Sequence, residues 1–166
     1  NGAMQVAQRG TSTSSYTSDG YSVCDRWMYR VSSLGTWTIS QDSTTPSGFG
    51  NSTKWDCTTA DASPAAGDTL VFSQRFEGQD LQQLKKGTSD AEKVTVSFYV
   101  YSNKTGTYIV ELYDVDNTRH ISKSYTINSA NTWEKRWISN RPHKPRHHGQ
   151  QKKKSKTLYP PTKFNE

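Results

Sequence analysis

Hydrophobic and polar residues alternate along most of the first 138 positions, which is typical of β-strands with one buried face. The clearest case is Lys93–Tyr101, where Val94, Val96, Phe98 and Val100 occupy every second position. The alternation predicts nine strands: Met4–Arg9, Tyr21–Val31, Thr36–Gln41, Thr53–Thr59, Asp68–Glu77, Lys93–Tyr101, Thr107–Val115, Arg119–Ile127 and Thr132–Ile138.

The segments between these strands are rich in Gly, Pro, Ser and Asn, as expected of turns and loops. Asp80–Lys85 is the one helix candidate, with Asp80 as N-cap, Gln83 in the capping-box position and Gly87 as the stop. Strands and helices do not alternate, so a parallel sheet is not indicated. The pattern predicts an all-β fold, a two-sheet antiparallel sandwich of jelly-roll type.

The alternation stops at Ser139, in the middle of what ought to be the closing strand, of which Thr132–Ile138 is the beginning. Residues 140–166 contain four prolines and the run Lys152–Lys154, and they show no strand or helix period. We therefore expect a β-sandwich domain at 1–139 and a disordered, basic tail at 140–166 that is dispensable for folding. Two origins of the tail stay open: a reading-frame artefact in the source sequence, or a genuine basic extension.

The charge is distributed unevenly between these two parts. Eight of the 21 Lys and Arg but one of the 15 Asp and Glu lie in 141–166, so the tail carries +7 and residues 1–140 carry −1. Binding to nucleic acid can therefore rest only on the tail. The tail has few aromatic residues among its charges, which favours nonspecific phosphate contact at most. No segment approaches the roughly 20 apolar residues of a membrane span.

Catalytic chemistry has little support in the sequence, and we expect no enzymatic activity. Glycoside hydrolysis needs two carboxyl groups that flank the scissile bond, and the nearest pairs are Glu77 with Asp80 and Glu111 with Asp114. The N-cap role explains Asp80, and Glu111 lies in mid-strand. His120 is an ordinary strand residue, and no serine has the surroundings of a hydrolase nucleophile.

No cofactor or metal site is expected either. Asp114, Asp116 and Asn117 could supply oxygen ligands to a structural Ca²⁺, but an ordinary Asp/Asn turn explains them equally well. Cys24 and Cys57 lack metal-binding spacing. They are best interpreted as two small buried apolar residues, with a disulfide as the alternative.

A binding surface has the best physical case. If the Val/Phe row of Lys93–Tyr101 faces the core, Tyr99 and Tyr101 face outward. The same parity places Glu111, Tyr113 and Arg75 outward, and a tight turn at Asn103–Gly106 would bring the tyrosine pairs together across two paired strands. Tyrosine rings and planar polar groups suit sugars, so these five residues form the predicted glycan site. Four tryptophans are assigned to the core: Trp27, Trp37, Trp55 and Trp133.

Five segments resemble a domain that recurs in phage tail-fibre and related virion proteins. They are Asn1–Ser12, Tyr21–Trp27 (YSVCDRW), Phe72–Leu84 (FSQRFEGQDLQQL), Lys93–Leu112 and Tyr125–Arg136. The resemblance covers about residues 1–138, and the chain departs from it after Trp137, where a further β-rich stretch would be expected. It implies a structural part of a virion whose sandwich is similar to carbohydrate-binding modules.

Taken with the binding surface, this resemblance favours a non-catalytic, virion-located domain that recognises host-surface glycans through many weak contacts. Its expected partners are those glycans, other virion proteins and further copies of this chain, as a homo-oligomer in the parent fibre. Two alternatives stay open: a carbohydrate-binding accessory module of a larger glycan-active enzyme, and nonspecific nucleic-acid binding by the tail.

Overall fold

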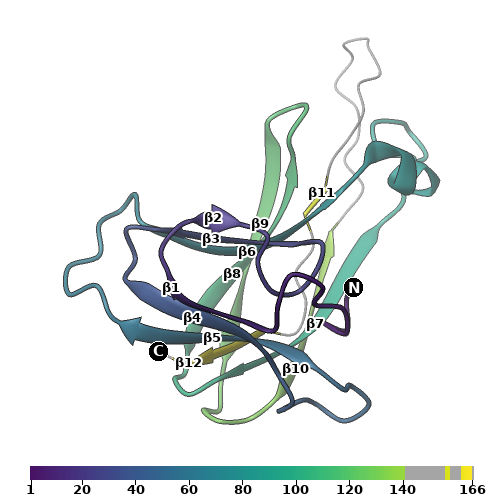
Figure 1. Ribbon diagram of the computed structural model, residues 1–166. Coiled ribbons are helices and arrows are strands. Elements are labelled where there is room, and N and C mark those ends of the chain that lie inside the picture. Colours follow the sequence, from purple (N-terminus) through teal and green to yellow (C-terminus); the bar gives the residue numbers. More distant parts are fainter. Residues whose placement is uncertain (141–155, 158–161, 166) are drawn as a thin grey trace.

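The computed structural model describes residues 1–140, 156–157 and 162–165, which form β-strands and one short 3₁₀ helix, η1 (Figure 1). The elements in chain order are β1 (Ser12–Tyr16), β2 (Asp19–Gly20), β3 (Trp27–Ser32), β4 (Thr36–Asp42), β5 (Ser52–Thr59), β6 (Thr69–Phe76), η1 (Gly78–Leu84), β7 (Val94–Ser102), β8 (Gly106–Asp114), β9 (Arg119–Ile127), β10 (Glu134–Asn140), β11 (Lys156–Thr157) and β12 (Thr162–Asn165).

These strands form three sheets. The largest has the order β1-β4-β5-β12-β7-β10, the second has the order β11-β6-β3-β2, and β8 pairs with β9 alone. Strand pairs are antiparallel except that β12 runs parallel to both β5 and β7. The predicted all-β, sandwich-like fold is confirmed, whereas the jelly-roll connectivity stays a prediction.

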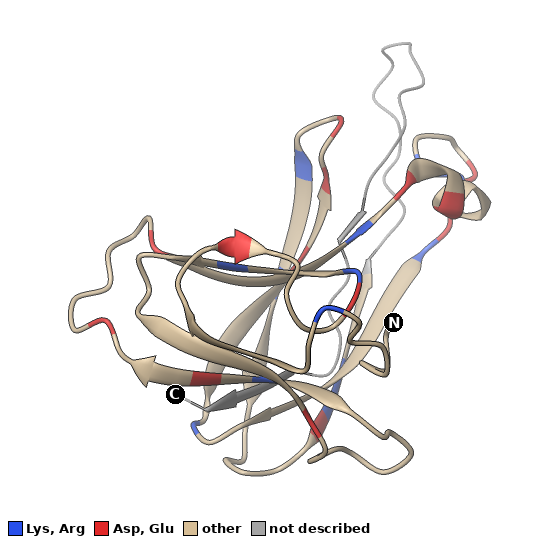
Figure 2. Cartoon of the chain, in the orientation of Figure 1, with Lys and Arg blue, Asp and Glu red and all other residues tan. Residues whose placement is uncertain are grey.

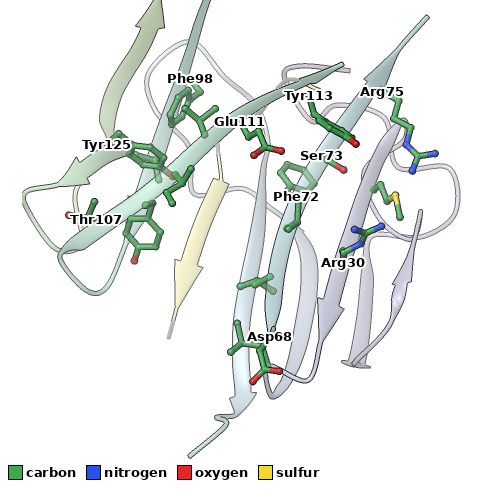
Figure 3. Close-up of a pocket in the computed structure, with 18 of the residues that line it drawn as sticks. Arg30, Asp68, Phe72, Ser73, Arg75, Phe98, Thr107, Glu111, Tyr113 and Tyr125 are labelled. Atoms are coloured by element: carbon green, nitrogen blue, oxygen red, sulfur yellow. The ribbon is translucent and has the colours of Figure 1, made fainter. Parts of the chain in front are cut away.

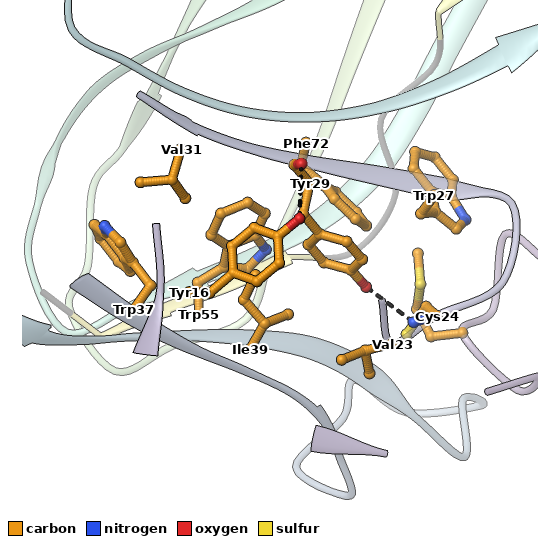
Figure 4. Close-up of a cluster of buried hydrophobic side chains, with 11 residues drawn as sticks. Tyr16, Val23, Cys24, Trp27, Tyr29, Val31, Trp37, Ile39, Trp55 and Phe72 are labelled. Carbon is orange, nitrogen blue, oxygen red and sulfur yellow. Dashed lines mark hydrogen bonds between the residues drawn. The ribbon is translucent and has the colours of Figure 1, made fainter. Parts of the chain in front are cut away.

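The first core lies between the β3–β6 pair and the β4–β5 pair, and it is dominated by aromatic rings (Figure 4). Trp27, Tyr29, Trp37 and Trp55 are buried because they fall on the inward parity of their strands. Phe72 stacks on Trp27 at 4.7 Å and lies 4.9 Å from the ring of Tyr29. Three of the four tryptophans assigned to the core therefore lie there.

A buried hydroxyl ties this core together. The Tyr29 oxygen accepts a hydrogen bond from the Cys24 backbone N–H at 3.0 Å and lies 3.3 Å from Thr53 Oγ1. Tyr16 donates to the Tyr29 carbonyl at 3.2 Å. Burial is the main cause that raises the pKa of Tyr29, and it also raises the pKa values of Tyr16 and Cys24.

The second core is smaller and lies between β7 and the β8–β9 hairpin. Its buried members are Val96, Phe98, Val100, Val110 and Ile127. The stacked rings of Tyr108 and Tyr125 pack against it, with centroids 5.8 Å apart. The two clusters are separate, so each half of the chain builds its own apolar centre.

The N-terminal prediction was wrong. Met4–Arg9 forms no strand, because Met4 turns with a φ of 55° and its N–H bonds back to the Asn1 carbonyl. The first strand is instead β1, inside the segment read as the loop Gly10–Gly20, where it pairs with β4. Its residues are mainly Ser and Thr at a sheet edge, which leaves little apolar alternation to detect.

The position of the predicted helix was right, but its predicted N-cap residue was wrong. Gly78–Leu84 is a 3₁₀ helix whose N-cap is Glu77, and no side chain caps it, so Asp80 does not have the predicted role. The helix ends at Lys85, which is left-handed with a φ of 45°. Cys24 and Cys57 are both free thiols, so the disulfide alternative is not realised.

Two short pieces of the tail form strands, one at the edge of a sheet and one inside a sheet. Lys156–Thr157 pairs with Phe76 and Arg75 of β6, and Thr162–Asn165 lies between β5 and β7. The rest of the predicted disordered tail lies outside the described residues. In residues 1–140, acidic and basic residues are interspersed along strands and loops (Figure 2).

Candidate functional site

The outward face of β7 follows the predicted parity. Val96, Phe98 and Val100 are buried, while Tyr99 and Tyr101 lie on the opposite face of the strand and are partly exposed. The alternation of hydrophobic and polar residues therefore placed both tyrosines on the correct side of the sheet.

Strand β10 extends this face beside β7. In the antiparallel register Lys135 lies opposite Tyr99, and Trp137 lies opposite Ser97. Trp137 is 69% exposed, the largest exposed fraction among the large apolar side chains of the described residues. At the end of the same row the hydroxyls of Thr95 and Ser139 are 3.0 Å apart.

Ring contacts hold the outward side chains in one layer. Phe49, from the loop between β4 and β5, meets Tyr99 edge-on with ring centroids 5.4 Å apart. Trp133 packs on Tyr101 at 5.5 Å, and Lys135 Nζ lies 5.7 Å from the centre of the Tyr99 ring. We call this surface the aromatic face; it comprises Phe49, Tyr99, Tyr101, Trp133, Lys135 and Trp137.

Polar contacts anchor β10 and thus half of the aromatic face. The Arg136 guanidinium donates two hydrogen bonds to the Thr126 carbonyl, at 2.9 and 2.7 Å, and pairs with Glu134. The Glu134 carboxylate accepts from the backbone N–H groups of Asn128 and Ser129, the latter at 2.7 Å. These charge-assisted bonds fix the strand against the end of β9.

The second surface is a cavity of about 950 Å³ between β6 and β8, which we call the slot (Figure 3). Residues 70–73 and 107–111 line it from its two sides, and Phe98 and Val100 line its floor. Arg75, Glu111 and Tyr113 lie along its outer rim. The Glu111 carboxylate accepts a hydrogen bond from Ser122 Oγ at 2.9 Å.

The structure therefore divides the five predicted site residues between two surfaces. Tyr99 and Tyr101 lie on the aromatic face, whereas Arg75, Glu111 and Tyr113 line the slot. The predicted pairing of the two strands was wrong: β10 and β12 occupy the two edges of β7, and β8 pairs with β9. The chain crosses from one layer to the other between them instead of closing a hairpin.

Sequence reasoning missed part of the aromatic face. Trp133 was assigned to the core but packs on the outward ring of Tyr101, and Phe49, Lys135 and Trp137 were not considered. The available signal was the spacing of Trp133, Lys135 and Trp137, because residues two apart on a strand share a face. If Trp137 had been assigned to the outward face, the same spacing would have assigned Trp133 to that face too.

The remaining sequence candidates, the Asp/Asn turn after β8 and His120, show no arrangement suited to metal binding or catalysis among the described residues. Asp114 accepts a hydrogen bond from Asn117 Nδ2 at 2.9 Å, which is a local contact within the turn that follows β8. Among the described residues there is no group of three or more His, Cys, Asp or Glu side chains placed to hold a metal ion. The structural Ca²⁺ considered at this turn stays a prediction. His120 is an exposed strand residue opposite Tyr113.

Comparison with protein-family models, curated proteins and solved structures gave no match. Within the part of the chain that the structure describes, no helix has the length and apolar character needed to cross a membrane.

Proposed function

We propose that the chain is a non-catalytic glycan-binding module of a phage tail-fibre-type virion protein, and that the aromatic face contacts the sugar. The observation that carries this proposal is Trp137, which is 69% exposed within a row of aromatic and hydroxyl side chains. The assignment to a virion is supported only by the sequence resemblance given above.

The chemistry of the aromatic face suits a sugar ring. Sugars present apolar C–H faces that pack on indole and phenol rings, and hydroxyls that exchange hydrogen bonds with polar side chains. Trp137 and Tyr99 supply the rings, while Ser97, Ser139 and Lys135 supply donors and acceptors beside them. Because ring contacts already hold Tyr99 and Tyr101, these side chains lose little conformational freedom on binding.

A shallow face of this kind binds a sugar weakly, and several copies of the domain on one fibre would strengthen the overall binding. Several copies on one fibre raise the effective concentration of each face after the first contact, so avidity exceeds the single-site affinity. The proposed partners are therefore host-surface glycans, with other virion proteins and further copies of the chain in the parent fibre.

Glycan-array binding by the full chain, presented on multivalent beads, tests the proposal. Trp137→Ala should lower retention on the bound glycans at least tenfold, because it removes the most exposed ring of the face. Tyr21→Ala is the matched control, since Tyr21 is an exposed aromatic residue outside the face, and it should bind as the parent does. Unchanged binding by both Trp137→Ala and Tyr99→Ala would overturn the proposal.

The non-catalytic part of the proposal has its own test. Incubation with the bound polysaccharides, followed by detection of released products, should show no turnover. Turnover that disappears in both Glu77→Gln and Glu111→Gln would identify a hydrolase instead.

A further inference from the structure

One lysine lies among the rings of the aromatic face. Lys135 lies opposite Tyr99 in the register of β10 and β7, with its Nζ 5.7 Å from the centre of the Tyr99 ring. Trp137 is two residues further along β10 and therefore on the same face. A ligand that packs on these two rings comes within reach of the ammonium group.

The positive charge of Lys135 is not balanced by a carboxylate in the part of the chain that the structure describes. No ion pair of these residues includes Lys135. The neighbouring acid, Glu134, has the opposite parity in β10, pairs with Arg136 and accepts hydrogen bonds from the backbone N–H groups that follow β9. The charge of Glu134 is thus compensated on the other face of the strand.

The outward positions beside Lys135 add no negative charge. On β7 and β10 these positions hold Thr95, Ser97, Tyr99, Tyr101, Trp137 and Ser139. At the other edge of β7, Lys163 of β12 takes the register position next to Tyr101. Lys54 follows on β5, where Asp56 pairs with it at 3.1 Å. The tyrosine pair of β7 therefore has a basic residue on each of the two neighbouring strands.

This arrangement favours a ligand that carries both a sugar ring and a negative charge. The ammonium group of a lysine has three donors and no acceptor. Hydrogen bonds from such a group to an ionised acceptor are shorter and stronger than bonds between neutral groups. A neutral sugar would pack on the rings but would leave this charge without an anionic partner.

We propose that the aromatic face binds an acidic polysaccharide, in which a carboxylate or sulfate group pairs with Lys135 while a sugar ring packs on Trp137. The inference rests on the proposed glycan-binding function and names its class of ligand. The rings hold the sugar, and the lysine selects acidic sugars over neutral ones. An exposed ion pair of this kind raises the affinity up to about fivefold.

Two matched pairs of immobilised polysaccharides test the proposal with the full chain in about 0.15 M salt. One pair is polygalacturonate and its methyl ester, which has the same backbone without the charge, and the other is dextran sulfate and dextran. In at least one pair the acidic member should bind about fivefold more tightly, and Lys135→Gln should lower this ratio of affinities by a similar factor. Lys135→Arg keeps the charge and should keep the ratio. The pair that responds identifies the anionic group.

Two control variants separate the aromatic face from the overall charge of the chain. Lys123→Gln removes one positive charge from the exposed part of β9, and Lys153→Gln removes one from the basic C-terminal segment. Each should change the ratio by less than about twofold, because charges far from the bound anion are screened by salt. Trp137→Ala should weaken binding to the acidic member, since attraction of a polyanion to basic residues elsewhere does not need the ring.

Three outcomes would overturn the proposal. They are equal affinity for the two members of each pair, binding to none of the four polysaccharides, and an effect of Lys135→Gln no larger than that of Lys153→Gln. The last result would assign the preference for acidic polysaccharides to the overall charge of the chain. The proposed glycan-binding function is judged separately, because it stands under each of these results if Trp137→Ala lowers retention on the glycan array.

Discussion

The two halves of the molecule differ in how they use their aromatic residues. In β1–β6, Trp27, Tyr29, Trp37, Trp55 and Phe72 are buried in one cluster. In β7–β10, Phe98 is the one buried aromatic residue among the described ones, and the other rings lie at the surface or at the margin of the core.

The exposed apolar residues are distributed in the opposite way. Ile109, Val115, Ile121 and Trp137 lie in the second half, against Val6 and Tyr21 in the first. The second half thus leaves apolar area in contact with water that the first half has buried, and such surfaces commonly mark interaction sites. The difference indicates that the first half mainly stabilises the fold, whereas most of the proposed glycan-binding surface lies in the second half.

The largest expected effect is the loss of a ring from the first core. Trp55 is 0% exposed and contacts the rings of Tyr29, Trp37 and Phe72, so Trp55→Ala should lower the free energy of unfolding by about 3–5 kcal/mol. Urea denaturation followed by tryptophan fluorescence measures this. A loss below about 1 kcal/mol would mean that the first half does not dominate stability.

A smaller effect is expected from the second core. Phe98→Ala also removes a buried ring, but Phe98 borders the slot, where the structure can relax, so we expect a loss near 3 kcal/mol, at the low end for this substitution. Hydrogen exchange should show the loosening in β7–β10, with β3–β6 still protected. Equal loosening of both halves would show that the two cores unfold as one unit.

Alkaline pH should weaken the first half selectively. The folded-state pKa of Tyr29 is raised by burial and by the neighbouring Cys24 thiol, so the unfolded chain releases this proton first. The contribution is fully present below the ordinary tyrosine pKa of about 10 and is lost as pH rises above it. Thermal unfolding between about pH 8 and 11 measures the slope, which should be shallower in Tyr29→Phe. An unchanged slope in that variant would exclude Tyr29 as the source.

The smallest effect on stability should come from the aromatic face. Trp137→Ala should change the free energy of unfolding by less than about 0.5 kcal/mol, since the side chain is mostly exposed. A loss of several kcal/mol would mean that Trp137 contributes to packing, and its effect on glycan binding would then have a structural cause.

Alternation predicted which side of a strand each residue faces, but not which strand lies beside it. Val96, Phe98 and Val100 point inward and Tyr99 and Tyr101 outward, as the pattern of β7 requires. The partner of β7 depends on where the chain goes after Ser102, and a short polar turn is compatible with either a hairpin or a crossing between layers. The predicted site was divided for this reason, although the parity assigned to its members was right.

The sequence-based prediction also failed for an edge strand and for a half-exposed aromatic residue. β1 is too polar to show alternation, so its pairing with β4 could be found only in three dimensions. Trp133 carries a side chain typical of cores but packs on Tyr101 at the surface. Residue type favours burial for tryptophan on average, and only its neighbours decide a particular case.

The position of β12 has a consequence for the order in which the molecule forms. Thr162–Asn165 pairs with Thr53–Asp56, so this contact joins segments about 100 residues apart and closes a loop of high entropic cost. The hairpin of β8 and β9 and the pairing of β4 with β5 are local and can form early. During synthesis, β5 and β7 therefore leave the ribosome long before the strand that separates them, and we expect the closure of the six-stranded sheet to be the last and slowest step.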